Sequence, residues 1–203
     1  MRGAILVLSG PSGSGKSTLI REMVKDIGPY YFSISTTTRA PREGEKEGVD
    51  YHFVDKEEFK EDIKEELFLE YALVHGNYYG TSLKPVESAL AEGKLVIFDI
   101  DVQGHESIKN RLHDITTSVF ITTPTFEVLK ERLSARKTDS QEIINKRLEM
   151  AKIEIQRIGE FDFIIVNDAL DESIKEIKAV ALTSKLKKAP ASIDAFKTLW
   201  QGM

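Results

Sequence analysis

The octapeptide Gly10-Pro11-Ser12-Gly13-Ser14-Gly15-Lys16-Ser17 lies between a short apolar run and a segment with helical periodicity. It fits the pattern G-x-x-x-x-G-K-[ST] of a phosphate-binding loop (P-loop), whose backbone N–H groups and following helix surround phosphate oxygens. A flexible glycine-serine connection would rarely match this pattern by chance, and rarely between a strand and a helix. The octapeptide and the adjacent Thr18 therefore predict a nucleoside triphosphate site, with Lys16 on the phosphates and Ser17 on Mg²⁺.

Apolar runs recur along the chain, and each is followed by a segment of helical periodicity. Continuous apolar runs are typical of strands that are buried on both faces of a parallel sheet. Alternation of strands and helices, joined by right-handed crossovers, indicates a doubly wound α/β fold. We therefore expect a P-loop three-layer α/β core with a parallel sheet built from the runs Ile5–Leu8, Leu95–Phe98, Val119–Ile121 and Phe163–Val166.

Composition excludes several classes of protein. The chain has 203 residues, of which 41% are hydrophobic and 30% are charged, so it is long enough for a hydrophobic core. It contains no cysteine, which excludes disulfide scaffolds and thiolate metal sites. The net charge of −5 argues against a protein that covers nucleic-acid phosphates. No apolar run approaches the length of a membrane span. We expect a cytoplasmic protein that binds neither nucleic acid nor membrane.

Two polar residues follow predicted strands. Asp99 and Asn167 come directly after apolar runs, at the strand ends where open α/β sheets collect ligands. Asp99 is a candidate to hold a water on Mg²⁺, and Asn167 a candidate contact for the nucleotide. A polar strand end or a helix cap is the alternative for both.

Two segments break the strand–helix rhythm, residues 33–79 and 136–141. The first contains Arg39 and Arg42, three residues apart, and then Tyr51. Two planar guanidinium groups and a phenol at this spacing favour a clamp for one phosphate group. We expect one domain with a core at about 1–33, 82–135 and 148–190, a nucleotide-binding insertion at about 34–81, a lid at about 136–147 and a C-terminal helix at about 191–203.

The segment Thr37–Val54 resembles the signature of the guanylate kinase family. Further matches follow in that family's order: Glu70, His75–Thr81, Asp99–Gly104 and Val166–Asp168. The resemblance extends from about residue 3 to residue 182. It implies Mg²⁺-dependent transfer of the γ-phosphate of ATP to GMP, and to dGMP, in purine nucleotide metabolism.

The resemblance also assigns roles to single residues. It implies that GMP is bound around its base by Ser35, Glu70, Thr81 and Asp101 and at its phosphate by Arg39, Arg42, Tyr51 and Tyr79. Guanine presents N1–H and N2–H₂ as adjacent donors, so a carboxylate such as that of Glu70 can accept from both. Adenine has an acceptor at N1 and would leave the carboxylate poorly paired.

Three arginines are candidates to act on the transferring phosphate. Arg132 and Arg136 are four residues apart and fall on one helix face, whereas Arg147 shares a stripe with Ile143 and Ala151. The family resemblance implies that all three contact the phosphates from a lid and the adjoining helices. Arginines and Lys16 can stabilise the charge that spreads over the transferred group.

Alternatives remain open at this point. One is a catalytically inactive guanylate-kinase-like module that binds proteins, although the P-loop is intact. Another is a kinase for a different monophosphate or a phosphorylated sugar. The sequence leaves open whether the chain is a monomer or a homo-oligomer. The C-terminal helix carries an apolar stripe made by Ile193, Phe196, Leu199 and Trp200. We expect this stripe to dock on the body of the protein, or else on a second subunit.

Overall fold

The computed structural model describes residues 3–42, 44–74, 76–135, 140–187 and 190–202. Its centre is a five-stranded sheet in which every neighbouring pair is parallel. The strand order is not the chain order, as expected when helices cross over between strands. The α/β fold with a parallel sheet is thereby confirmed. From edge to edge the strands are β2 (Tyr30–Phe32), β7 (Leu95–Asp99), β1 (Ala4–Ser9), β8 (Thr116–Thr122) and β9 (Phe163–Val166).

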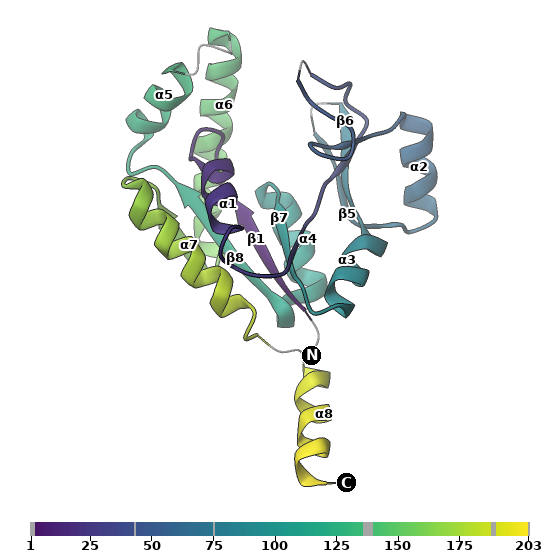
Figure 1. The fold of residues 1–203 in the computed structure, drawn as a ribbon. Coiled ribbons are helices and arrows are strands. Elements are labelled where there is room, and N and C mark those ends of the chain that lie inside the picture. Colours follow the sequence, from purple (N-terminus) through teal and green to yellow (C-terminus); the bar gives the residue numbers. More distant parts are fainter. Residues whose placement is uncertain (1–2, 43, 75, 136–139, 188–189, 203) are drawn as a thin grey trace.

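Helices cover both faces of this sheet, which makes three layers (Figure 1). Side chains alternate along β1, so Leu6 and Leu8 face one layer while Ile5 and Val7 face the other. The first layer contains α1 (Lys16–Met23) and α7 (Leu170–Ser184), and the second contains α3 (Leu83–Ala91) and α4 (Val102–Leu112).

The expectation that every strand is buried on both faces is wrong for β9. Phe163, Ile164 and Val166 are about half exposed, and only Ile165 is buried, in the cluster that includes Ile177 of α7. The reason is position, because β9 is the edge of the sheet and pairs only with β8. An apolar run alone cannot distinguish a central strand from an edge strand.

A second, four-stranded sheet stands beside the core (Figure 1). It is mixed, since β3 pairs parallel with β4 and antiparallel with β6. The helix α2 (Lys56–Lys64) packs on it and begins at Asp55, whose carboxylate accepts from the N–H of Glu58 at 2.8 Å. The strand order is β4 (His52–Phe53), β3 (Thr36–Thr37), β6 (Asn77–Ser82) and β5 (Phe68–Val74).

Phe59 joins α2 to this sheet. Its ring is fully buried and stacks on Phe68 at 4.3 Å and on Tyr78 at 5.2 Å between ring centroids. We expect Phe59→Ala to destabilise folding by about 3–5 kcal/mol, the usual cost of removing a buried phenyl ring. Thermal unfolding would measure the loss. The partly exposed Phe126 supplies a control, because Phe126→Ala should cost much less; equal losses would contradict this packing role.

Two further helices, α5 (Phe126–Ala135) and α6 (Gln141–Glu154), lie on the opposite side of the molecule from the second sheet (Figure 1). They pack through a small apolar cluster made by Leu129, Leu133, Ile144, Leu148 and Ala151. The predicted stripe on α6 is therefore correct at Ala151 but wrong by one residue at its start, since Ile143 is 43% exposed and Ile144 is buried. Arg147 lies beside the buried stripe and is half-buried.

Short 3₁₀ turns complete the core at η1 (His113–Ile115) and η2 (Ile155–Glu160). The final helix, α8 (Pro190–Gln201), points away from the body (Figure 1). Its apolar stripe is exposed, from 45% at Ile193 to 80% at Trp200, so the expected docking on the protein's own body is not observed. Within the described residues, no helix combines the length and apolarity that crossing a membrane requires.

Candidate active site

The P-loop leaves the end of β1 and takes backbone conformations that favour glycine. Gly10 has φ +134°, and a Cβ atom there would lie 2.0 Å from the carbonyl oxygen of Ile121. Gly15 has φ +95°, and its Cβ would lie 2.2 Å from Nδ2 of Asn167. A side chain at Gly10 would therefore displace the backbone of β8, and one at Gly15 would displace the side chain of Asn167 and strain the left-handed backbone. The glycines of the motif hold the loop close against the sheet.

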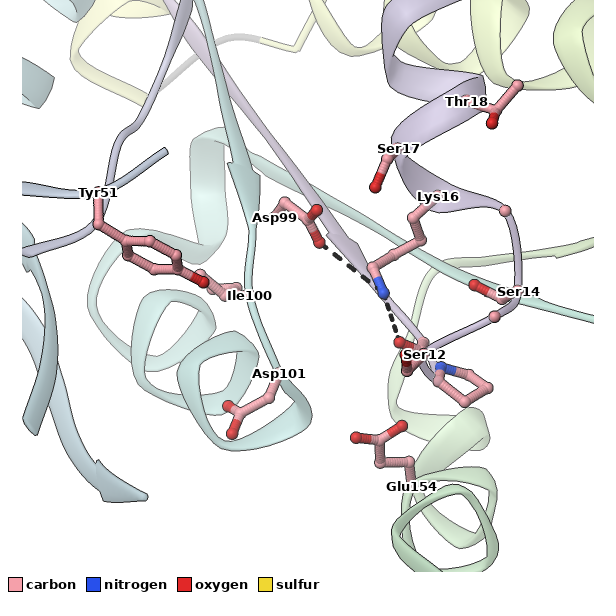
Figure 2. Close-up of a pocket in the computed structure, with 14 residues that line it drawn as sticks. Ser12, Ser14, Lys16, Ser17, Thr18, Tyr51, Asp99, Ile100, Asp101 and Glu154 are labelled. Carbon is pink, nitrogen blue, oxygen red and sulfur yellow. Dashed lines mark hydrogen bonds and ion pairs between the residues drawn. The ribbon is translucent and has the colours of Figure 1, made fainter. Parts of the chain in front are cut away.

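The first turn of α1 opens toward the cleft. Gly15 caps this helix without any side-chain hydrogen bond, and the first turn contains no acidic residue. The N–H groups and the positive end of the helix are therefore available to an anion. Lys16 donates to the carbonyl oxygen of Gly10 at 2.5 Å, and its Nζ lies 3.8 Å from Oδ1 of Asp99 (Figure 2).

A cavity of about 380 Å³ lies over this loop. All nine residues of the predicted triphosphate site from Gly10 to Thr18 line it, together with Tyr51, Asp99 and Asp101. The parallel register places Asp99 beside Leu8, just before the loop begins. Burial raises the pKa of Asp99, and the ammonium group of Lys16 opposes that effect. Residues 10–18 and the predicted metal residue Asp99 thus line one cavity.

Asn167 is close to the loop but does not line the cavity. Its side chain is 4% exposed and donates from Nδ2 to the carbonyl oxygen of Ser14 at 2.8 Å. Its own N–H donates to Thr122 on β8 at 2.7 Å. The structure therefore places Asn167 behind the P-loop, where it ties the loop to the end of the sheet.

A second cavity of about 490 Å³ lies between the P-loop and the four-stranded sheet. Of the residues expected around GMP, it is lined by Ser35, Tyr51, Glu70, Tyr79 and Asp101. The side chain of Asp101 also begins α4, because Oδ1 accepts from the N–H groups of two residues of its first turn, at 3.0 and 2.8 Å. Five of the eight predicted residues therefore surround one cavity.

Glu70 and Thr81 form a pair at the wall of this cavity. They face each other across the antiparallel strands β5 and β6, and the Thr81 hydroxyl donates to Oε1 of Glu70 at 2.6 Å. Thr81 itself is fully buried, so its hydroxyl positions the carboxylate from behind. Burial raises the pKa of Glu70, the Thr81 hydrogen bond opposes this, and the charge of Asp101 adds to it.

Arg39 is held on several sides at the edge of the cavity. It donates from Nη2 to Glu45 and from Nη1 to the carbonyl oxygen of Ala40, both at 2.8 Å. Its guanidinium lies 5.3 Å from the centroid of the Tyr51 ring. The Glu45 carboxylate raises the pKa of Arg39, and a hydrogen bond with Tyr79 adds to that effect against the opposing effect of burial.

Arg42 does not join Arg39 through its side chain. Its side chain is exposed, and its backbone N–H donates to Oε2 of Glu45 at 2.8 Å. Neither arginine lines the second cavity. Glu45 therefore holds both arginine residues, through the side chain of Arg39 and the backbone of Arg42, although the sequence analysis did not identify it. Its position three residues after Arg42, within the family signature, was the available signal.

The three arginines predicted for the lid and its adjoining helices do not share one position in the structure. Arg147 donates from Nη1 to the hydroxyl of Ser12 at 3.1 Å, so it contacts the P-loop, although it does not line the triphosphate cavity. Arg132 donates from Nη2 to the carbonyl oxygen of Asn167 at 2.9 Å. Arg136 lies outside the described residues. Glu154 is a residue that sequence reasoning missed, and it lines both cavities.

Comparisons with known proteins agree with this geometry. The family model described as guanylate kinase matches residues 2–184. A guanylate kinase of Sulfurimonas denitrificans is 61% identical over 98% of this chain and 97% of its own. One of Wolinella succinogenes is 56% identical over 98% of this chain and 93% of its own. The crystal structure of guanylate kinase from Anaplasma phagocytophilum is 34% identical, covers 92% of this chain and 88% of its own, and superimposes with a TM-score of 0.74. The chain therefore belongs to the guanylate kinase family.

Proposed function

We propose that the protein transfers the γ-phosphate of ATP to GMP, giving ADP and GDP. The observation that carries this proposal is the common wall of the two cavities. Ser12, Tyr51, Asp99 and Asp101 line both of them, so a ligand over the P-loop and a ligand against Glu70 would meet at this wall. Direct transfer requires such a meeting of donor and acceptor oxygens.

Acceptor choice rests on Glu70. Its carboxylate is fixed by Thr81 and can accept from both N1–H and N2–H₂ of guanine. Arg39, oriented by Glu45 and the Tyr51 ring, is the fixed cation that we assign to the acceptor phosphate. Base and phosphate would then be held at opposite ends of one cavity, which aims a phosphate oxygen toward the P-loop.

Phosphoryl transfer itself needs charge stabilisation rather than a side-chain nucleophile. Lys16 and the first-turn N–H groups of α1 would hold the phosphates of ATP, and Arg147 approaches the same loop from α6. Closure of the cleft would keep water from competing with GMP.

The residues fit Mg²⁺, which the family uses with ATP. Ser17 and Asp99 both line the triphosphate cavity and present oxygen donors, the kind that this cation takes. Among the described residues there is no group of three or more acidic, cysteine or histidine side chains that would enclose a metal. A site with few protein ligands suits an ion that keeps waters and binds substrate phosphates. Mg²⁺ bound there would neutralise charge on the transferring phosphate.

An acceptor panel tests the proposed function. ADP formation from Mg·ATP should depend on GMP and should be far slower with AMP, UMP or no acceptor. A folded protein that forms no ADP with any acceptor would contradict the proposal and favour the inactive interaction module. A preference for AMP or UMP would contradict the role of Glu70 while leaving the kinase assignment in place.

A further inference from the structure

Glu154 is a partly buried acidic group at the junction of the two cavities. It is the last residue of α6 and lines both the 380 Å³ and the 490 Å³ cavity. Its Oε2 is buried and accepts no hydrogen bond from the described part of the protein. Figure 2 shows its carboxylate directed toward the space between Asp101 and Ser12. A buried oxygen without a donor is costly, so this atom is suited to a donor on a ligand.

The helix α6 presents two charged groups to the cleft. Arg147 and Glu154 are seven residues apart, which is two helical turns, so they lie on the same side of the helix about 10 Å apart along its axis. Arg147 contacts Ser12 of the P-loop, where phosphates are expected. A carboxylate two turns away would repel phosphate oxygens and is suited to a hydroxyl or an N–H donor.

The groups that face Glu154 do not supply that donor. Burial raises the pKa of Glu154, Lys16 opposes this effect, and the neighbouring Asp101 adds to it. The ammonium group of Lys16 already contacts Gly10 and Asp99. Asp101 accepts hydrogen bonds from the first turn of α4 and has none to give as a carboxylate. A hydroxyl donor from a ligand would relieve the desolvation of the Glu154 carboxylate.

GMP carries hydroxyl donors on its ribose, which lies between its base and its phosphate. In the second cavity the base is expected at Glu70 and the phosphate at the Tyr51 and Tyr79 end, so the ribose lies between them. Resting on the proposed function, we propose that the Glu154 carboxylate accepts a hydrogen bond from a ribose hydroxyl of GMP. Glu154 is thus a specificity-determining residue that makes the ribose part of acceptor recognition.

The test is a cycle of protein and ligand changes. Wild-type protein, Glu154→Gln and Glu154→Ala are assayed with GMP, 2′-deoxy-GMP and 3′-deoxy-GMP, and the binding of all three nucleotides to each protein is measured by calorimetry without ATP. Loss of a hydrogen bond to a charged group lowers kcat/KM by about tenfold. We expect one deoxy analogue to show this loss with wild-type protein. Glu154→Ala should lower kcat/KM for GMP about as much and leave that same analogue nearly unaffected.

Controls separate this role from others. Glu149→Gln changes an exposed carboxylate on the same helix, paired with Lys152 at 2.7 Å, and should change nothing. Equal losses with GMP and both deoxy analogues in Glu154→Ala would overturn the proposal, as would a changed Mg²⁺ requirement without a ribose effect. If wild-type protein bound GMP but did not phosphorylate it, the proposed function would fail. The calorimetric cycle would still decide the ribose contact.

Discussion

Replacement of Lys16 by alanine is expected to lower kcat by about 10²–10³-fold, the usual cost of removing one positioned charge from a transition state. Lys16 lines the P-loop cavity, and its ammonium group is hydrogen-bonded to the carbonyl oxygen of Gly10 and lies 3.8 Å from Asp99. Charge on the transferring phosphate develops where this group can reach, so its loss acts on the chemical step more than on GMP binding. Steady-state kinetics with GMP and ATP varied separately would measure the change.

The same substitution leaves Asp99 without its cation, so folding must be checked alongside activity. Thermal unfolding of Lys16→Ala and of Lys16→Met distinguishes a loss of catalysis from a loss of structure. Lys146→Ala is the matched control, because Lys146 is exposed on α6 and pairs only with Glu142 among the described residues. Turnover of a folded Lys16→Ala protein within a few-fold of wild type would contradict the role of Lys16.

Replacement of Glu70 by glutamine is expected to lower kcat/KM for GMP by about 10²–10³-fold. Glutamine keeps the shape and can still accept from Thr81, but it offers guanine an N–H₂ group where the carboxylate offers an acceptor. Guanine loses one hydrogen bond to a charged acceptor, and one of its N–H donors then faces the N–H₂ donor of the glutamine. The loss should appear mainly in KM for GMP, with KM for ATP nearly unchanged. Glu87→Gln, an exposed carboxylate on α3, is the control.

The pH dependence gives an independent reading of Glu70. Burial raises its pKa above the usual 4.5, so the carboxylate is lost at a higher pH than for an exposed glutamate. KM for GMP should therefore rise as the pH falls toward that raised pKa, and this rise should be absent in Glu70→Gln.

As the pH falls, GMP binding should weaken, whereas the folding stability contributed by Glu70 should increase. A folded-state pKa above the unfolded value contributes stability below pH 4.5 and loses it as the pH rises through the folded pKa. Glu70→Gln should therefore raise Tm at pH 7. An unchanged Tm together with an unchanged pH profile would contradict the buried state of this group.

Local patterns predicted the parts of the site that lie close together in sequence. The P-loop letters, the preceding strand and the following helix form one continuous segment, and the structure places residues 10–18 around one cavity. Arg39 and Tyr51 belong to one short segment, and they are in contact. Asp99 was identified from its position after an apolar run, and the register of β7 with β1 brings it to the P-loop.

Contacts between distant segments were harder to predict. Asn167 was expected at the nucleotide, yet it lies behind the P-loop, because the end of β9 approaches the carbonyl oxygen of Ser14. The stripe on α6 was wrong by one residue at its start, since Ile143 and Ile144 are equally apolar and only the packing of α5 decides which is buried. Glu154 had no pattern of its own that marked it for a site, and Glu45 was marked only by its position within the family signature.

The sequence by itself determined four of the five strands of the central sheet, their alternation with helices, the phosphate-binding loop and the family. These depend on residues within one or two helical turns or one strand, where spacing dictates geometry. Tertiary structure decided which groups share a cavity. The pairing of β5 with β6 puts Thr81 against Glu70, and the path of α6 brings Glu154 to the wall that the two cavities share. Burial and the electrostatics it causes arise only when such separate segments pack together, which is why they cannot be read from spacing alone.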